Sequence, residues 1–165
     1  AEELVQSMQY LPDCQLFIVG DGTVIPQLKK MTKQTRLQDR ITFVPRQTPE
    51  NLFNYTSLAN IGMAIDTDQS ANLRFSLPNK IFEYIKAGTP MVVSNLVERA
   101  DIVKMYDVGE ISSTVTPESI AQAVKKLAVP ERLAQCRENC KTAAQELTWE
   151  NEEKVLEKIY DQFGC

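Results

Sequence analysis

The chain has 165 residues, 43% of them hydrophobic, which is enough for one domain with a full core. Its 22 acidic and 18 basic residues give a net charge of −4, which argues against a general nucleic-acid surface because such a surface needs clustered Lys and Arg. The absence of histidine excludes Ser-His and Cys-His nucleophile pairs and the common His-based zinc sites.

The first predicted elements are a helix and a strand. Apolar residues follow helical spacing from Leu4 to Leu11, so we expect the chain to be a fragment cut at the entrance of a helix. Residues 15–19 form a continuous apolar run that ends in Gly20, Asp21 and Gly22. Continuous apolar strands that alternate with helices predict a parallel sheet covered on both faces. The glycine turn lacks the third glycine of a dinucleotide fingerprint, so a tight strand-to-helix turn is the alternative to a phosphate loop.

A helix over residues 24–35 and a second strand over residues 40–44 follow. The strand ends at Pro45 and Arg46. The guanidinium of Arg46 could lie flat on a nucleotide base, since guanidinium groups stack on aromatic rings. An exposed loop arginine is the alternative.

Thr48, Pro49 and Glu50 have the composition of a helix start, with an N-cap threonine, a proline at the first position and an acid in the first turn. The predicted helix reaches residue 58, a third strand covers residues 61–65, and a polar loop covers residues 66–74. Two aspartates of this loop, Asp66 and Asp68, could suggest a metal, but two acids in a flexible loop more often indicate solvation.

The most informative stretch is residues 75–95, FSLPNKIFEYIKAGTPMVVSN. Pro78 has its φ angle preset for the first turn of a helix, and Gly88 stops that helix. Ile81, Phe82 and Ile85 are spaced to share its buried side, and residues 91–93 then predict a short apolar strand.

The turn that opens this helix has the features of a phosphate site. A helix N-terminus exposes free backbone N–H groups and the positive end of the helix dipole. Lys80 would add a mobile positive charge, and Glu83 lies one turn beyond Asn79 on the same face, where it could bind a pair of sugar hydroxyls. A solvated, salt-bridged face of Lys80, Glu83 and Lys86 is the alternative. The residues of this turn are Ser76, Leu77, Pro78, Asn79 and Lys80.

Beyond this stretch, residues 100–106 predict a short helix and residues 110–112 a last, short edge strand. Thr116, Pro117 and Glu118 repeat the helix-start chemistry, so residues 116–127 predict a helix, and residues 130–147 predict another. Thr148 opens the final predicted helix. Its apolar stripe is Val155, Leu156, Ile159, Tyr160 and Phe163.

The four cysteines, Cys14, Cys136, Cys140 and Cys165, show neither a CxxC pair nor a secreted-domain framework, so reduced thiols of a cytosolic protein are expected. No apolar run reaches about 18 residues, and the first residues lack the charged and apolar regions of a signal peptide. We therefore expect a soluble chain.

The order and spacing of these pieces resemble the C-terminal domain of the retaining, family 4 glycosyltransferases of GT-B fold. The resemblance covers nearly the whole chain and implies an α/β, Rossmann-like doubly wound parallel sheet, the C-terminal half of a GT-B fold. It also implies that residues 1–165 are a single donor-nucleotide-binding domain lacking the N-terminal acceptor domain. The matching segments are LFIVGDG, ITFVPRQ, SLPNKIFEYIKAGTPMVVSN, GEISSTVTPESIAQAV and LTWENEEKVLEKIY.

The resemblance also assigns site residues. In that family a glutamate five residues before the glycine of an AxG-Pro-Val-Val element binds the donor ribose, and Glu83 before Gly88 matches it. The family's other glutamate, eight residues earlier, is replaced here by Phe75, so the ribose contact keeps its residue and the family's donor-sugar contact does not. Asn72 and Arg74 are the nearest polar groups that could replace it.

By the same resemblance, the loop of Gly20, Asp21 and Gly22 lies near the donor nucleotide, and the base lies near Pro45 and Arg46. The diphosphate would bind at the N-terminus of the Pro78 helix. The loops at residues 20–22, 45–47 and 66–77 and at Asn95 all follow predicted strands, so in an open α/β sheet they are expected to converge on one edge.

The implied function is donor binding in a hexosyltransferase-type glycosyltransferase. The donor would be a nucleotide diphosphate sugar. The acceptor would be a glycan or a lipid-linked molecule in bacterial surface polysaccharide synthesis. The resemblance implies no metal and no cofactor besides this substrate, and it assigns no catalytic residue. The fragment is expected to be inactive alone. We expect a cytoplasmic location, with the full-length protein peripheral to the inner face of the membrane.

Two other classes stay open. A nucleotide-sugar 2-epimerase has a similar GT-B architecture but uses acid and base groups around the sugar, and the apolar Phe75 does not favour it. A non-catalytic α/β nucleotide-binding or signalling module, such as a receiver domain, needs an acidic pair near the first strand. The residues at the first strand offer no acidic pair, since they are Phe17, Ile18 and Val19.

Overall fold

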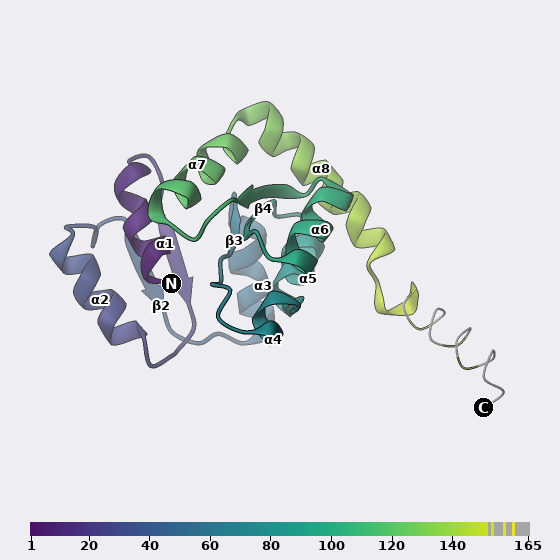
Figure 1. Cartoon of the computed structure of the whole chain (residues 1–165), viewed down its shortest axis with the longest axis horizontal. Coiled ribbons are helices and arrows are strands. Elements are labelled where there is room, and N and C mark those ends of the chain that lie inside the picture. Colours follow the sequence, from purple (N-terminus) through teal and green to yellow (C-terminus); the bar gives the residue numbers. More distant parts are fainter. Residues whose placement is uncertain (152, 154–156, 158–159, 161–165) are drawn as a thin grey trace.

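The computed structural model describes residues 1–151, 153, 157 and 160. In these residues short strands alternate with helices along the chain (Figure 1). The elements are α1 (Glu2–Ser7), η1 (Met8–Tyr10), β1 (Leu16–Val19), α2 (Ile25–Gln34), β2 (Ile41–Val44), α3 (Pro49–Leu58), β3 (Gly62–Ala64), α4 (Ala71–Arg74), α5 (Asn79–Lys86), β4 (Met91–Ser94), α6 (Val97–Tyr106), β5 (Gly109–Ser112), α7 (Pro117–Leu127) and α8 (Pro130–Glu146).

The described strands pair in parallel, as expected, but they form two hydrogen-bonded sheets rather than one. β1 pairs with β2. β3, β4 and β5 pair in that order. One hydrophobic cluster takes side chains from both sheets, including Ile18 of β1, Ile41 of β2 and Val92 of β4. The two sheets are therefore joined by packing.

Helices cover both faces of the β3–β5 sheet, which confirms the doubly wound arrangement. Because side chains alternate along a strand, Val92 points into the cluster formed with α1, α2 and α7, whereas Met91 and Val93 point into a second cluster with α5, α6 and α8. Figure 1 shows α1 beside α7 on one side and α5 beside α6 and α8 on the other.

The first strand is less covered than its continuous apolar sequence predicts. Leu16 and Ile18 pack into the first cluster, but Phe17 points to the other face with 52% of its surface exposed. The expectation of a strand covered on both faces is therefore wrong for β1. It holds for β4, where every residue is buried.

The two predicted threonine caps are confirmed. Thr48 Oγ1 accepts a hydrogen bond from the Asn51 amide at 3.3 Å, and Thr116 Oγ1 accepts one from the Ser119 amide at 3.3 Å. Each satisfies a donor that the first turn of a helix would leave free, which explains why both helices begin where the sequence predicts.

Three predicted boundaries need correction. Pro78 has extended backbone angles and is the N-cap of α5, not its first helical residue. The expected loop 66–74 contains the short helix α4, in which the Arg74 amide donates to the Ser70 carbonyl at 2.9 Å. The helix expected from residue 100 begins at Val97.

Helix α5 ends as predicted at Gly88, which has a positive φ of 67° that suits glycine. The Gly88 amide donates to the Ile85 carbonyl at 3.0 Å and the Thr89 amide to the Tyr84 carbonyl at 2.9 Å, the bond pair of a Schellman motif. Thr89 Oγ1 then donates to the Thr56 carbonyl of α3 at 2.8 Å. The C-terminal end of α5 is therefore fixed to its neighbour.

The inner face of α5 packs on β3 and the second cluster. Ile81 and Ile85 are buried, whereas Phe82 is only half-buried. Tyr84 lies across Gly62 of β3, where an added Cβ would meet the tyrosine ring at 2.7 Å, and its hydroxyl donates to the Met63 carbonyl at 3.2 Å. The missing side chain at Gly62 thus lets α5 approach the sheet closely.

The predicted final helix falls largely outside the described residues. Thr148 Oγ1 accepts from the Asn151 amide at 3.3 Å, as expected of a cap. Of the predicted stripe, Tyr160 is described and exposed. The others, Val155, Leu156, Ile159 and Phe163, lie outside the described residues.

Among the described cysteines, Cys14, Cys136 and Cys140 are free thiols, and Cys165 lies outside the described residues. Burial raises the pKa of Cys136 to about 11 and that of Cys140 to about 12. Within the described residues no helix is both long and apolar enough to cross a membrane.

Candidate functional site

The carboxyl ends of β1 and β2 bring two of the predicted loops side by side. Val19 pairs with Val44, and the Gly20 amide donates to the Val44 carbonyl at 3.0 Å. The backbone at Gly20 has a φ of 133°, which a side chain would strain. Gly20 and the loop of Pro45 and Arg46 therefore start from adjacent points of one sheet edge.

A pocket of about 610 Å³ opens at this edge, between the strand ends and helices α3 and α5. Three predicted site residues from separate parts of the sequence line it, namely Gly20, Arg46 and Glu83. The pocket lining does not include Asp21, Gly22, Pro45 or the predicted turn 76–80. The other lining residues are Val19, Gln47, Pro49, Glu50, Leu52, Phe53, Asn54, Thr56 and Lys86.

The pocket wall combines opposite charges with an aromatic surface. Arg46 and Lys86 supply positive charge, Glu83 a carboxylate, and Phe53 of α3 has 42% of its surface exposed. A planar guanidinium and an aromatic ring suit a flat heterocycle. A carboxylate suits hydroxyl groups, because it accepts several hydrogen bonds. This arrangement fits a nucleoside better than a purely apolar ligand.

The turn at residues 76–80 lies at the N-terminus of α5, one helical turn from Glu83. The N-cap residue Pro78 makes no side-chain cap bond here, and the Ile81 amide bonds back to the Pro78 carbonyl at 3.0 Å. Asn79 and Glu83 are both exposed and share one helix face. A ligand that contacts Glu83 from the pocket could therefore extend along α5 to this turn.

A buried arginine that sequence reasoning did not identify holds the turn in place. Arg99 of α6 is 1% exposed. Its Nη1 donates to Asp66 Oδ2, its Nη2 to Ser76 Oγ at 3.1 Å, and its Nε to the Ser76 carbonyl at 3.4 Å. Arg99 therefore joins the loop after β3 to Ser76, the first residue of the α5 turn.

Asp66 is more constrained than the expected solvated loop residue. Besides Arg99, its Oδ2 lies 3.4 Å from Lys80 Nζ, and its amide donates to Ser94 Oγ at the end of β4 at 3.2 Å. The expectation of simple solvation is wrong here because Asp66 balances the charge of a buried arginine. Asp68 instead pairs with Arg74 at 2.8 Å. No group of three or more potential His, Cys, Asp or Glu metal ligands gathers anywhere in the described part of the chain.

Phe75, at the position where the resembling family has a glutamate, is 59% exposed. Of the two residues considered as its replacement, Asn72 is exposed and Arg74 is engaged by Asp68. Neither lines the pocket.

Arg99 and Phe53 could not be found from the sequence by their local patterns. Arg99 is in a helix with charged residues on several sides, ERADIVK, so its burial depends on the distant Asp66 and Ser76. Phe53 could be read as an ordinary core residue of α3, but it is 42% exposed and lines the pocket together with residues that are distant in the sequence.

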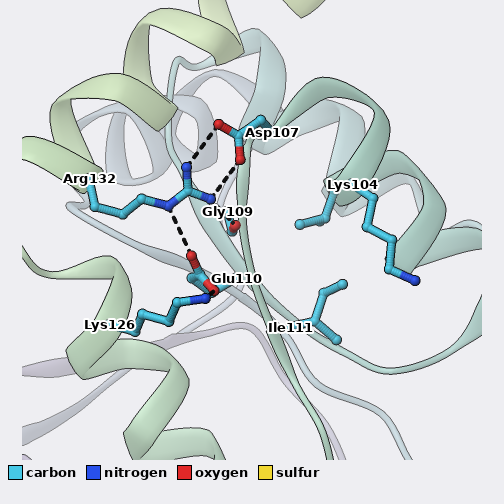
Figure 2. A pocket seen from close by; sticks show the side chains of 8 residues that line it. Lys104, Asp107, Gly109, Glu110, Ile111, Lys126 and Arg132 are labelled. Carbon is cyan, nitrogen blue, oxygen red and sulfur yellow. Dashed lines mark hydrogen bonds and ion pairs between the residues drawn. The ribbon is translucent and has the colours of Figure 1, made fainter.

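A second, smaller pocket of about 290 Å³ lies at the amino-terminal end of β5 (Figure 2). Four of its charged side chains, those of Asp107, Glu110, Lys126 and Arg132, are paired with each other. Arg132 of α8 binds Asp107 through two hydrogen bonds of 2.7 and 2.8 Å, and its Nε donates to Glu110 at 2.9 Å. Lys126 of α7 reaches the other oxygen of Glu110 at 2.6 Å.

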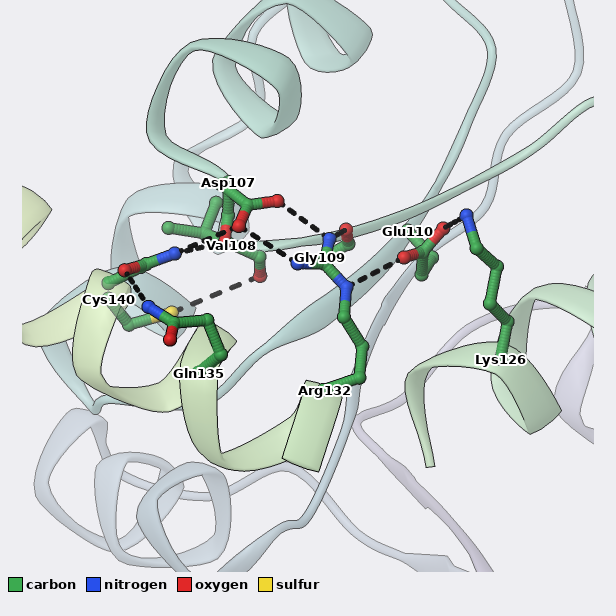
Figure 3. A network of polar contacts seen from close by, with 9 residues as sticks. Asp107, Val108, Gly109, Glu110, Lys126, Arg132, Gln135 and Cys140 are labelled. Carbon is green, nitrogen blue, oxygen red and sulfur yellow. Dashed lines mark hydrogen bonds and ion pairs between the residues drawn. The ribbon is translucent and has the colours of Figure 1, made fainter. Parts of the chain in front are cut away.

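This polar network connects α8 to the segment between α6 and β5 (Figure 3). Arg132 also donates to the Gly109 carbonyl at 3.1 Å, and Asn139 donates to the Asp107 carbonyl at 2.9 Å. Because these groups satisfy one another, the pocket has the character of a structural network rather than a ligand site. Lys126 extends the same network to α7.

Stability should depend on pH through Asp107. Its hydrogen bonds to Arg132 hold the pKa of Asp107 below the ordinary value of 3.8. A carboxyl with a lowered folded-state pKa contributes stability above 3.8 that is lost as the pH falls through its folded-state pKa. We expect urea unfolding midpoints to fall less steeply below about pH 4 in Asp107→Asn than in the wild type.

Asparagine tolerates the positive φ of 50° at position 107, so the substitution changes the charge without straining the backbone. Asp101→Asn, at an exposed position in helix α6, which Asp107 directly follows, serves as the matched control and should keep the wild-type pH dependence. Equal slopes for Asp107→Asn and wild type would contradict the prediction.

Comparison with known proteins agrees with the fold and the order of the segments. A profile of the family described as Glycosyl transferases group 1 matches residues 1–147. The chain therefore belongs to the group 1 glycosyl transferases. A search of curated protein sequences finds no match.

Solved structures place the fold within the GT-B class. The sucrose-phosphate synthase of Thermosynechococcus elongatus is similar with a TM-score of 0.79 and 23% identity over 98% of this chain and 41% of that protein. WaaG, a glycosyltransferase involved in lipopolysaccharide biosynthesis, is similar with a TM-score of 0.70 and 16% identity, over 93% of this chain and 40% of that protein. The pneumococcal O-GlcNAc transferase GtfA, in complex with UDP and GlcNAc, is similar with a TM-score of 0.71 and 15% identity, over 97% of this chain and 32% of that protein.

The chain thus spans less than half of each of these proteins. Its fold is that of the C-terminal half of a GT-B glycosyltransferase, as the sequence resemblance implies.

Proposed function

We propose that this chain is the donor-binding domain of a hexosyltransferase-type glycosyltransferase and that it binds a nucleotide diphosphate sugar. The observation that carries the proposal is the pocket at the ends of β1 and β2. It brings Gly20, Arg46 and Glu83 together although 63 positions, from 20 to 83, separate the first from the last. Ligands of open α/β sheets bind outside the carboxyl ends of strands, where this pocket lies.

The proposed ligand lies with its base near Pro45 and Arg46, its ribose hydroxyls on Glu83 and its diphosphate at the N-terminus of α5. The turn of α5 supports the last assignment, because its N-cap Pro78 makes no side-chain cap bond and the N-terminus of a helix favours an anion. Gly20, Asp21 and Gly22 form the loop nearest the nucleotide. Lys80, now 3.4 Å from Asp66, is close enough to the same turn to contact a phosphate.

During transfer, the bond between the sugar and the diphosphate breaks and negative charge develops on the departing nucleotide diphosphate. The α5 amides and Lys80 would stabilise this charge electrostatically. We propose no metal and no cofactor. The acceptor would bind to an N-terminal domain of the same full-length protein, so the chain by itself should be inactive.

The acceptor class is a finer proposal. A glycan or lipid-linked acceptor of bacterial surface polysaccharide synthesis is supported by the sequence resemblance and by the likeness of the fold to WaaG, whose process is lipopolysaccharide biosynthesis. Transfer to such an acceptor would take place in the cytoplasm, with the full-length protein peripheral at the inner face of the membrane.

The proposal is tested by titrating the chain with UDP, GDP, ADP and CMP, followed by saturation-transfer NMR and thermal shift. A dissociation constant of ~1 mM and ~10 mM ligand would stabilise the fold by roughly 1.4 kcal/mol. Glu83→Ala is expected to weaken binding of the preferred nucleotide about tenfold or more, since it removes hydrogen bonds to a charged group. Glu146→Ala, an exposed glutamate near the end of α8, is the control and should bind like the wild type.

Two results would contradict the proposal. Failure of both the chain and the full-length protein to bind any of the four nucleotides would remove donor binding. Formation of an epimerised nucleotide sugar by the full-length protein without any acceptor would replace transfer by epimerisation.

A further inference from the structure

Arg99 is a cation in a place where an unpaired charge would be strongly unfavourable. With 1% of its surface exposed, it needs partners for its guanidinium N–H groups. Asp66 supplies the opposite charge and Ser76 supplies two neutral acceptors, a hydroxyl and a carbonyl. Asp66 follows β3 and Ser76 precedes α5, so one side chain of α6 fixes two loops at once.

The planar shape of the guanidinium is suited to this task. Nη2 and Nε both contact Ser76 while Nη1 contacts Asp66, so the three nitrogens fix the direction of the Ser76 backbone as well as its position. A lysine ammonium is a single point and cannot reproduce this geometry. Ser76 lies two residues before Pro78, the N-cap of α5, and its direction sets where the first amides of the helix point.

The same arginine alters the electrostatics of the turn. The Asp66 carboxylate lies 3.4 Å from Lys80 Nζ and would by itself hold that ammonium and repel an incoming anion. Arg99 shares the same oxygen, Oδ2, and so offsets the carboxylate charge. Asp66 is in turn held by Ser94 Oγ, which accepts from its amide at 3.2 Å.

We propose that Arg99 is a positioning residue for the diphosphate part of the donor. It orients the turn at residues 76–80 and neutralises Asp66, so that the α5 amides and Lys80 face an incoming diphosphate. This inference rests on the proposed donor binding and adds that recognition of the diphosphate is separable from recognition of the nucleoside. The nucleoside part would contact Arg46 and Glu83, which lie in the pocket and not in the Arg99 cluster.

The test compares affinities for nucleosides and their diphosphates on the 165-residue chain, using uridine with UDP, guanosine with GDP and adenosine with ADP. Arg99→Met is expected to weaken the preferred diphosphate about tenfold or more and to leave its nucleoside within about twofold. Arg99→Lys keeps a charge beside Asp66 and should recover part of the loss. In NMR spectra without ligand, the backbone amides of Ser76, Leu77, Asn79 and Lys80 should shift in Arg99→Met, whereas those of β1 and β2 should not.

Arg132→Met is the matched control, because Arg132 also binds carboxylates but lies in the network at β5. It should leave the ratio of diphosphate to nucleoside affinity unchanged even though it removes ion pairs. If Arg99→Met does not fold, Arg99→Lys tests the proposal instead. Its ratio of diphosphate to nucleoside affinity should still be lower than that of the wild type.

The possible failures are distinct. If neither the 165-residue chain nor the full-length protein binds nucleosides or diphosphates, donor binding and this inference fail together. If the wild type prefers a diphosphate and the Arg99 variants keep the wild-type ratio, or lose nucleoside and diphosphate binding equally, the positioning role alone is overturned.

Discussion

Substitution of Gly109 by alanine is expected to destabilise the protein by at least about 3 kcal/mol, a large part of the stability of an ordinary domain. A Cβ at this position would lie 1.9 Å from the carbonyl oxygen of Met91, far inside van der Waals contact. Met91 is the register partner of Gly109 in the neighbouring strand, and its amide already donates to the Val108 carbonyl at 3.1 Å. Relief of the clash would therefore require the β4 and β5 backbones to separate.

Urea unfolding followed by circular dichroism would measure this effect. Gly22→Ala is the matched control, since no atom lies within 4 Å of the added Cβ and the backbone there is not in the positive-φ region. That variant should keep the wild-type midpoint or rise slightly, because alanine restricts the unfolded chain. A Gly109→Ala midpoint equal to that of Gly22→Ala would show that the two strands can separate at little cost.

Ile85→Ala is expected to lower the free energy of unfolding by about 2–5 kcal/mol. Ile85 is 1% exposed and belongs to the cluster in which α5, α6 and α8 meet β4. Its truncation leaves a cavity, and the surrounding elements can close that cavity only partly because Gly88 and Thr89 fix the end of α5. The loss also loosens the helix that carries Glu83.

The control for this prediction is Leu58→Ala at the end of α3, where the leucine is 84% exposed. It removes a side chain of the same size at a site that buries little area and should change stability by less than about 0.5 kcal/mol. Chemical denaturation of both variants decides the matter. Comparable losses in the two would mean that the packing of α5 contributes little to stability.

The parts of the fold that the sequence predicts correctly depend on local chemistry. The caps at Thr48 and Thr116 involve residues three positions apart, so their patterns were sufficient to predict them. Gly88 likewise ends α5 through bonds within six residues. The alternation of apolar strands with helices predicted the doubly wound class, which requires only the order of elements.

The parts that could not be predicted depend on contacts between distant segments. Phe17 lies in an apolar run that suggests burial on both faces, but it is 52% exposed, whereas Leu16 and Ile18 pack into the first cluster. Asp66 looked like a solvated loop acid because its partner Arg99 is 33 positions away. The predicted start of α5 was wrong by one position at Pro78, because proline suits both the N-cap neighbourhood and the first turn.

The candidate site divides along the same line. The sequence predicted Gly20, Arg46 and Glu83, which the structure brings to one pocket, and their role in binding stays a prediction. Phe53 was missed, because its place on the pocket wall depends on the distant segments that carry Gly20 and Glu83.

The division of the described strands into two hydrogen-bonded sheets has a mechanical consequence for the pocket. Gly20 and Arg46 belong to the edge of the β1–β2 sheet, whereas Glu83 is carried by α5, which packs on β3 of the other sheet. The pocket therefore lies between two sheets that share no backbone hydrogen bonds with each other in the described strands. A ligand bound there would contact elements of both sheets, so part of its binding free energy would go into holding the two sheets at a fixed distance.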